Sequence, residues 1–188
     1  MALLLETVLR MPGIGSCVIE ADGISDDAVA ACFAIAAPLR RENAFALGVK
    51  HGLAVAMPYG IDAVVVDSAS GAIALVRGLV GRSVAIGVDC GSRLAVAVSA
   101  DFNGADFVRY TPEYGQSNAG LDLHDVDWWR ESMAKPMVVR ADPGHEHVEE
   151  LFWSGADIVE FDVTNRETLE RLLERHEAIA DMARRYST

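Results

Sequence analysis

The stretch GIDAVVVD, residues 60–67, decides the fold, because its pattern occurs twice more along the chain. A glycine, a small or branched residue and an aspartate precede a β-branched or aromatic run, and the same order returns at residues 104–110 and 155–162. Glycine commonly ends a helix, so the pattern predicts a helix-to-strand joint at each place. The three glycines lie 44 and 51 residues apart, so each interval has room for two strand–helix units.

Apolar runs between and before these joints supply the remaining strands. The runs do not alternate between apolar and polar residues, which is typical of parallel strands covered on both faces. They lie at residues 16–20, 44–49, 83–88 and 136–140, and with the three joints they make seven expected strands. Helical patterns separate them at residues 25–42, 51–58, 69–80, 92–103 and 125–133. Strands that alternate with helices in this way predict an α/β fold with a parallel sheet.

Two more helices are expected toward the C-terminus. Asp142 and Pro143 have the residue types of an N-cap and of the first helical position. The capping-box pattern Thr-Asn-Arg-Glu at residues 164–167 predicts that the last helix begins at Thr164. The opening segment, residues 2–11, fits either a first strand or a helix that plugs the floor of a barrel.

The even repetition favours a small (β/α) TIM-type barrel that forms a single domain over residues 1–188. Seven strands are one short of eight, so such a barrel would be incomplete or irregular at its first strand. An open doubly wound sheet is the alternative. It is less favoured because the segment after the first strand, residues 20–26, has a single glycine rather than a glycine-rich dinucleotide turn.

Charge and composition exclude several classes of protein. The chain has 188 residues, with 28 acidic against 16 basic side chains and a net charge of −12. No basic run interrupts this surplus, so we expect no nucleic-acid partner. No apolar run is long enough to cross a bilayer, so we expect a cytoplasmic protein without a membrane partner. The three cysteines lack metal-ligand spacing and are expected to be reduced thiols.

The order of these pieces resembles the thiamine phosphate synthase and thiazole tautomerase superfamily of small TIM barrels. The resemblance covers roughly residues 45–163 and implies the fold of that superfamily and a small-molecule ligand. The segments that carry it are residues 60–62, 85–88, 103–106, 112–124, 136–139 and 154–157.

The phosphate-binding motifs of that superfamily are not matched. Its pyrophosphate-gripping strand would fall at residues 18–22, where Glu20 and Asp22 stand instead of cations. Its phosphate loop would fall at residues 140–144, which read Arg-Ala-Asp-Pro-Gly. Carboxylates repel a polyphosphate. The resemblance therefore predicts the barrel, and the activity has to be argued from the residues of this chain.

Candidate site residues stand where the expected strands end, since barrels of this type carry their reactive groups at the carboxyl ends of the strands. The expected catalytic residues are Lys50, Asp67, Asp89 and Glu160, and the expected substrate-binding residues are Arg109, Arg140 and Asp162. A desolvated lysine can act as an acid–base group or form a Schiff base. An arginine can clamp a carboxylate or phosphate. Salt-bridged lysine and arginine, neutralising the acidic strand ends, are the alternative interpretation.

Magnesium is the one cofactor that this pattern suggests. Asp67 and Asp89 could hold Mg²⁺ through their carboxylates, with water and substrate oxygens completing the octahedron. The alternative is that these aspartates cap the helices that follow them.

Two functions of different classes follow from the sequence. The first is an enzyme, a lyase, isomerase or transferase, that acts on a phosphorylated or carboxylated heterocycle or sugar. The second is a non-catalytic barrel that serves as a binding or assembly protein. We expect a homo-oligomer. Trp128, Trp129 and Trp153 lie on expected helices, where packing in the core and a subunit interface are the alternatives.

Overall fold

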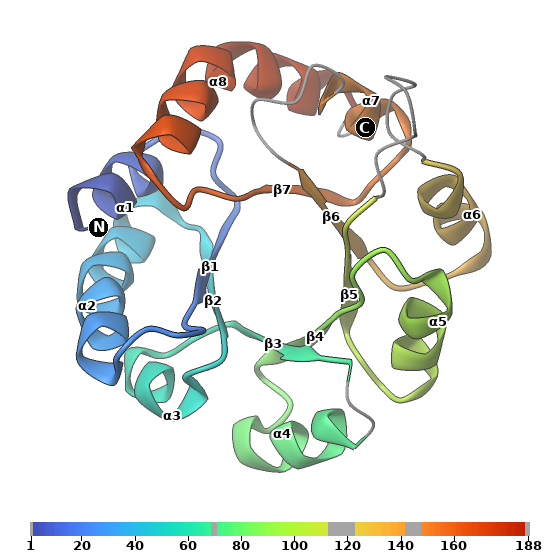
Figure 1. The fold of residues 1–188 in the computed structure, drawn as a ribbon, viewed down its shortest axis with the longest axis horizontal. Coiled ribbons are helices and arrows are strands. Elements are labelled where there is room, and N and C mark those ends of the chain that lie inside the picture. Colours follow the sequence, from blue (N-terminus) through green and yellow to red (C-terminus); the bar gives the residue numbers. More distant parts are fainter. Residues whose placement is uncertain (1, 69–70, 113–122, 142–147, 187–188) are drawn as a thin grey trace. The chain divides into compact units, whose positions relative to one another are not determined.

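The computed structural model describes residues 2–68, 71–112, 123–141 and 148–186. It divides into two compact units, residues 1–87 and 88–188, and each is described by itself. Both units alternate parallel strands with helices (Figure 1).

The first unit contains three complete strands and the start of a fourth. Its elements are α1 (Ala2–Leu9), β1 (Ser16–Glu20), α2 (Asp26–Asn43), β2 (Ala46–Lys50), α3 (Leu53–Ala56), the 3-10 helix η1 (Met57–Tyr59), β3 (Ala63–Asp67), α4 (Ala72–Val80) and β4 (Ala85–Asp89), whose last residues belong to the second unit. Strand β1 pairs in parallel with β2, which places Glu20 opposite Lys50. Strand β2 pairs in parallel with β3, which places Val65 opposite Lys50.

The second unit repeats this arrangement. Its further elements are α5 (Leu94–Phe102), β5 (Phe107–Tyr110), α6 (His124–Ser132), β6 (Met137–Ala141), α7 (Val148–Trp153), β7 (Ile158–Phe161) and α8 (Arg166–Tyr186). Strand β6 pairs in parallel with β5 on one side and with β7 on the other. In both units the strands follow one another in chain order. A doubly wound sheet reverses its strand order at a switch point, so the observed order favours the barrel class over that alternative.

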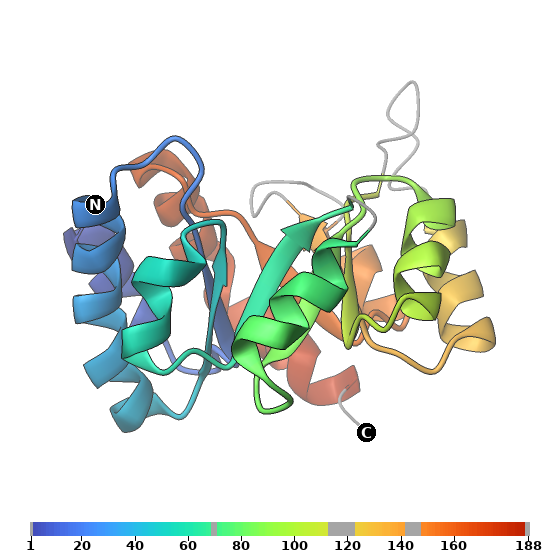
Figure 2. The same ribbon diagram turned by 90° about the horizontal axis from the view of Figure 1, so that it is seen from below.

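The opening segment is a helix, α1, which settles the choice that the sequence left open. Figures 1 and 2 show α1 beside α2. Leu9 of α1 is buried and belongs to the hydrophobic core of the first unit. Helix α2 begins as its sequence predicts, because the Ser25 Oγ accepts a hydrogen bond from the Ala28 N–H at 3.4 Å. Asp26 and Asp27 add negative charge at the positive end of its dipole.

The last helix begins one residue later than predicted. The Asn165 Oδ1 accepts from the Thr168 N–H at 3.0 Å, and the Thr168 Oγ1 accepts from the Asn165 N–H at 3.2 Å. This is a reciprocal cap in which Asn165 takes the place expected for Thr164. An asparagine carboxamide caps a helix at least as well as a threonine hydroxyl, which explains the shift. The helix start expected at Asp142 and Pro143 lies outside the described residues.

The aspartate of the repeated motif fixes the register between neighbouring strands. The Asp62 Oδ2 accepts from the Leu47 N–H at 2.8 Å, while the Asp62 N–H donates to the Leu47 oxygen at 2.7 Å. In the second unit the Asp157 Oδ2 accepts from the Met137 N–H at 2.9 Å. Each aspartate stands just before its own strand and holds the first residues of the preceding strand. The motif that predicted the fold therefore forms a turn and also fixes the register between neighbouring strands.

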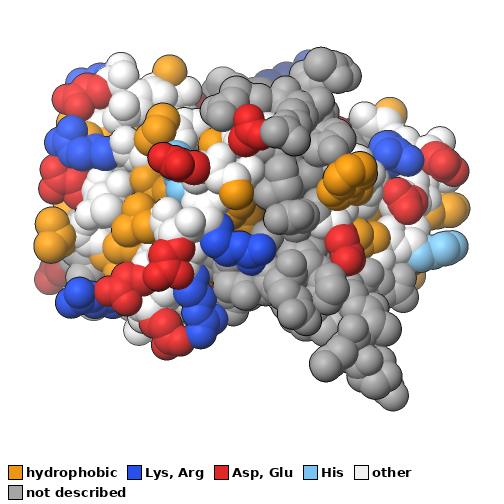
Figure 3. Space-filling model, turned by 90° about the horizontal axis from the view of Figure 1, so that it is seen from above, with side chains coloured by type: hydrophobic (Ala, Val, Ile, Leu, Met, Phe, Trp, Pro, Cys, Tyr) orange, Lys and Arg blue, Asp and Glu red, His pale blue; other side chains and the backbone are white. Residues whose placement is uncertain are grey.

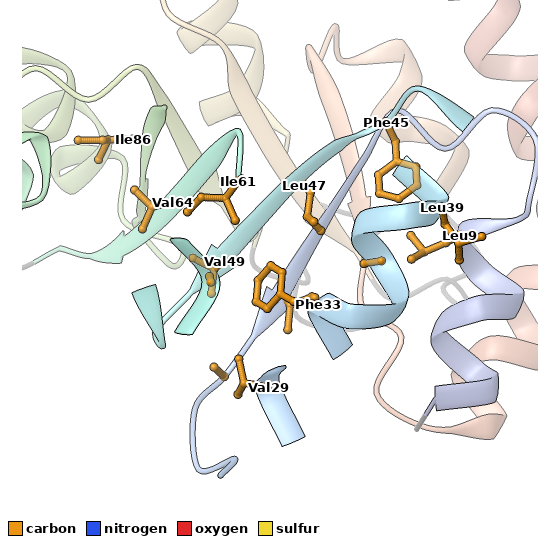
Figure 4. Packing of buried hydrophobic residues seen from close by; sticks show 14 residues of the cluster. Leu9, Val29, Phe33, Leu39, Phe45, Leu47, Val49, Ile61, Val64 and Ile86 are labelled. Carbon is orange, nitrogen blue, oxygen red and sulfur yellow. The ribbon is translucent and has the colours of Figure 1, made fainter. Parts of the chain in front are cut away.

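The core of the first unit lies between α2 and strands β2 and β3 (Figure 4). Phe33 of α2 is fully buried and stacks on Tyr59, with ring centroids 5.5 Å apart. Leu47 and Val49 are buried from β2, and Val64 is buried from β3. Fully burying side chains of this kind stabilises a domain by roughly 1.5–3 kcal/mol each. The apolar, non-alternating strands therefore hold the helices in place.

Among the residues that the structure describes, no helix is both long enough and apolar enough to cross a membrane. On the face drawn in Figure 3, acidic and basic side chains are interspersed rather than gathered by sign.

Candidate functional site

The first candidate cluster joins Lys50, His51 and Asp67 at the carboxyl ends of β2 and β3. The Lys50 Nζ lies 3.3 Å from the Asp67 Oδ1, and the His51 Nε2 lies 3.5 Å from the Asp67 Oδ2. One carboxylate therefore faces two nitrogen groups. The Lys50 side chain is 14% exposed and that of His51 is 39% exposed, so the imidazole is the more accessible of the two.

A strained turn places His51 in this cluster. His51 has a φ of 60° and Gly52 a φ of 64°, so two consecutive residues adopt the left-handed conformation. A left-handed conformation costs roughly 1–2 kcal/mol for a residue other than glycine. A Cβ on Gly52 would lie 3.1 Å from the Ala21 Cβ, so the turn also needs a residue without a side chain. Backbone strain of this kind is concentrated at functional sites.

Sequence reasoning identified Lys50 and Asp67 but did not select His51. The signal was available: a histidine and a glycine directly follow the strand, and a glycine there indicates a backbone that other residues adopt poorly.

The second candidate cluster is a chain of five alternating charges in the second unit. Arg109 on β5 reaches past β6 and donates twice to Glu160 on β7, from Nε to Oε2 and from Nη2 to Oε1, both at 2.6 Å. The Asp89 Oδ2 lies 3.6 Å from the Arg109 Nη1 and 3.6 Å from the Arg140 Nη1. The Arg140 Nη2 donates to both oxygens of Asp162, at 2.7 and 2.9 Å. The chain runs Glu160, Arg109, Asp89, Arg140, Asp162.

Burial changes along this chain. The Arg109 side chain is 1% exposed, and it is the innermost member. Asp89 and Arg140 are mostly buried, whereas Asp162 at the outer end is 45% exposed. Breaking a buried ion pair costs about 3–5 kcal/mol, while an exposed pair contributes about 0–1 kcal/mol. The inner end is thus fixed, and the outer end can exchange partners at little cost.

Tyr110, directly after Arg109, ties β5 to the helix that follows it. Its hydroxyl donates to the Asp125 Oδ2 at 2.6 Å and lies 3.4 Å from the Ser92 oxygen. Tyr110 is buried and Asp125 stands in the first turn of α6. The bond helps to hold the strand end on which Arg109 stands. The sequence pattern predicts no role for Tyr110, because its partner Asp125 lies in another element.

Cys90, next to Asp89, is closed off from solvent. Burial, with a smaller contribution from the neighbouring Asp89 carboxylate, raises the pKa of the Cys90 thiol to about 12. A thiol of this kind is neutral and inert at neutral pH. All three cysteines are free, as the sequence predicts.

The carboxylates expected to hold Mg²⁺ fit that ion poorly. Asp67 faces the Lys50 ammonium, and Asp89 lies between two arginines, so each carboxylate already meets at least one cationic group. A divalent ion placed there would be repelled by these side chains. Across the residues that the structure describes, no three His, Cys, Asp or Glu side chains gather as metal ligands. We therefore derive no step through a metal ion.

The structure thus brings five predicted site residues together in the second unit and two in the first. Asp89, Arg109, Arg140, Glu160 and Asp162 form one chain, and Lys50 and Asp67 form the other cluster with His51. Their roles as catalytic or substrate-binding residues stay predictions.

The tryptophans differ in their surroundings. Trp129 is fully buried, and its Nε1 donates to the Lys135 oxygen at 2.7 Å. Trp128 on the same helix is 38% exposed and Trp153 on α7 is 66% exposed. Packing within the unit therefore explains Trp129 and leaves the other two partly open to solvent.

Comparison with protein families gives one match over most of the chain. The family model described as thiamine monophosphate synthase matches residues 3–161. Comparison with curated proteins gives no match.

Three solved structures share the fold at low sequence identity. Thiamine phosphate pyrophosphorylase from Pyrococcus furiosus has a TM-score of 0.78 at 16% identity, covering 96% of this chain and 90% of its own. The Amycolatopsis orientalis BexX/CysO complex gives a TM-score of 0.64 at 16% identity, with coverage of 100% and 86%. The N-acetylmannosamine-6-phosphate 2-epimerase from Clostridium perfringens gives 0.62 at 11% identity, with coverage of 93% and 83%. These similarities show a TIM-type α/β fold. The chemistry has to be inferred from the residues of this chain.

Proposed function

The chain belongs to the thiamine monophosphate synthase family, and from this premise we propose that it is an enzyme acting on a phosphorylated or carboxylated small molecule. A lyase, isomerase or transferase reaction on a heterocycle or sugar is the class that we infer. The observation that carries the proposal is the Asp67 carboxylate shared by Lys50 and His51 at the ends of two parallel strands. Reactive groups in TIM-type folds stand at such strand ends.

In the proposed mechanism each of the three side chains of this cluster has a different role. Asp67 holds the Lys50 ammonium and orients the His51 imidazole, which can then give or take a proton. Lys50 is mostly buried, and a desolvated lysine can donate a proton or attack a carbonyl carbon to form a Schiff base. His51 is more exposed than Lys50, so of the two nitrogen groups it is the better placed to meet a substrate.

The substrate that we infer differs from a pyrophosphate ester. Glu20 ends β1 directly opposite Lys50 in the parallel register, and Asp22 follows it. These carboxylates would repel a group that carries several negative charges. A ligand with a single phosphate or carboxylate carries less negative charge and would be repelled less.

A metabolite-library thermal-shift screen, run with and without Mg²⁺, tests the proposal. A ligand present at 100 times its Kd should add about 2.7 kcal/mol to the free energy of unfolding. We expect hits among phosphorylated or carboxylated heterocycles and sugars, and turnover of a hit should fall in His51→Gln and Lys50→Met. Glu131→Gln, at an exposed glutamate of α6 outside both clusters, is the control and should keep turnover. Turnover that survives both cluster variants would overturn the assignment of this cluster.

A non-catalytic binding or assembly role is the second candidate, and one observation favours it. Trp128 and Trp153 keep large apolar surfaces in contact with solvent. Such side chains are enriched where protein surfaces meet. Analytical ultracentrifugation of the wild type and of Trp153→Ser tests this role: a homo-oligomer that the variant dissociates supports it, and a monomeric wild type removes it.

A further inference from the structure

We propose that Asp162 is an internal stand-in for an anionic ligand of the second unit: its carboxylate occupies the face of Arg140 that a phosphate or carboxylate takes on binding. This inference rests on the proposed function for the class of ligand, a phosphorylated or carboxylated small molecule. It also gives the chain a built-in competitor for its own ligand.

Geometry identifies Arg140 rather than Arg109 as the ligand-binding arginine. Arg109 is 1% exposed and makes a bidentate pair with Glu160, so a ligand would have to enter the protein interior to reach it. Arg140 points one nitrogen, Nη1, toward the buried Asp89 and the other, Nη2, toward the half-exposed Asp162. The first contact orients the guanidinium, and the second occupies its outer face.

Energy decides which contact a ligand displaces. Asp162 is half-exposed and Arg140 keeps its contact with Asp89, so releasing Asp162 into water costs little. Releasing Glu160 from the buried Arg109 would cost far more, because an uncompensated charge would stay behind. An incoming oxyanion therefore replaces Asp162 and leaves the rest of the charge chain intact.

The charge balance of the chain agrees with this exchange. The carboxylates Glu160, Asp89 and Asp162 outnumber the two arginines by one. With Asp162 turned into solvent, the remaining two carboxylates and two guanidinium groups balance. A ligand oxyanion on Arg140 then restores the alternation of signs that the protein makes by itself. A cationic ligand would find no acceptor that is not already facing an arginine within this chain of five side chains.

Titration calorimetry with inorganic phosphate, and separately with acetate, tests the exchange. Removing the competitor in Asp162→Ala should tighten binding by about fivefold, the factor that corresponds to a pair energy of about 1 kcal/mol. Tighter binding of phosphate alone identifies a phosphorylated substrate, and tighter binding of acetate alone a carboxylated one. If both anions bind more tightly, the site recognises negative charge and does not distinguish a phosphate from a carboxylate.

Matched variants separate this site from a general effect of charge. Asp127→Ala removes an exposed carboxylate that pairs with Arg130 at 3.7 Å, in the same unit, and should leave anion binding unchanged. Adding Arg140→Gln to Asp162→Ala should abolish the gain. Circular dichroism establishes that each variant is folded, and Asp162→Asn serves as a milder substitution if the alanine variant unfolds.

The results distinguish this inference from the proposed function. If Asp162→Ala and Asp162→Asn bind both anions no more tightly than the wild type, or if the gain survives Arg140→Gln, the stand-in role is wrong, even when the library screen finds a substrate. If the gain depends on Arg140 while the screen finds no turnover, the anion site stands and the enzyme proposal falls.

Discussion

The two charged clusters carry the same kinds of residue at the same kind of place, yet they differ in what they leave available. In the first unit, one carboxylate, Asp67, faces Lys50 and His51, and two of these three side chains are more than a third exposed. In the second unit, Arg109 is enclosed and its neighbours hold one another in a chain. Position at a strand end is therefore a poor guide to reactivity until burial and pairing are known.

The contrast also separates two uses of charge. The enclosed end of the charge chain fixes the strands that carry it, since Arg109 and Glu160 would each be costly to leave alone. An open cluster on a strained turn contributes little to stability and keeps its groups accessible. If this division is correct, a substitution in the enclosed chain should lower the free energy of unfolding several times more than a substitution in the open cluster.

The largest effect should come from the enclosed end of the charge chain. Arg109→Met leaves Glu160 without its partner, and we expect a loss of about 3–5 kcal/mol in the free energy of unfolding, measured in urea. The double variant Arg109→Met with Glu160→Leu removes both charges and should recover much of that loss. A single variant that costs less than about 1 kcal/mol would mean that this end is as open as the first cluster.

The next effect concerns the thiol beside Asp89 and shows how well the second cluster is sealed. With a pKa of about 12, the Cys90 thiol is neutral at pH 8, so iodoacetamide should label it about a hundredfold more slowly than an ordinary exposed cysteine. Mass spectrometry of timed samples measures the rate. Stability should fall as pH rises from the ordinary 9.0 toward about 12, because the unfolded chain ionises this thiol first. Equal labelling of Cys90 and a denatured control would show an open site.

A smaller effect tests the strained turn of the first cluster. Gly52→Ala adds a side chain at a φ of 64° and against Ala21, so we expect a loss of about 1–3 kcal/mol. Gly60→Ala is the matched control, because Gly60 has a similar φ of 71° and open space around it. The difference between the two losses measures the contact with Ala21. Equal losses would leave backbone conformation as the whole cause.

The smallest effect should come from Asp67. Asp67→Asn removes a carboxylate that is 59% exposed, and we expect a change of less than about 1 kcal/mol in the free energy of unfolding. The same variant should lose turnover of any substrate that the library screen finds. A large loss of stability would place Asp67 with the structural charges and end the contrast between the two clusters.

Much of the fold could be predicted because its signals are local. The glycine and aspartate of the repeated motif, the apolar runs and Ser25 act on residues close in sequence, and each element forms where they place it. The last helix moved by one residue because Asn165 and Thr164 are both good caps and only packing chooses between them. The opening segment could not be assigned because three leucines in a row suit a strand and a helix alike.

The candidate site was harder to predict, since its chemistry depends on pairs distant in sequence. Arg109 and Glu160 are 51 residues apart, and nothing local indicates that their charges neutralise each other inside the unit. The strand-end rule could place both at one edge of the sheet, but it could not say which arginine would be enclosed. His51 was missed for the opposite reason: its backbone conformation, not its spacing, brings it to Asp67.

The aspartate joints at Asp62 and Asp157 have a consequence for how such a chain can change in length. Each joint aligns a strand with the strand before it, through one carboxylate that accepts from a backbone N–H. This hydrogen bond joins residues at the two strand starts and none of the helix that connects the strands. Residues can therefore be inserted into or deleted from the connecting helices without sliding one strand past the next. A chain of this design can grow by whole segments, each of which brings its own means of alignment.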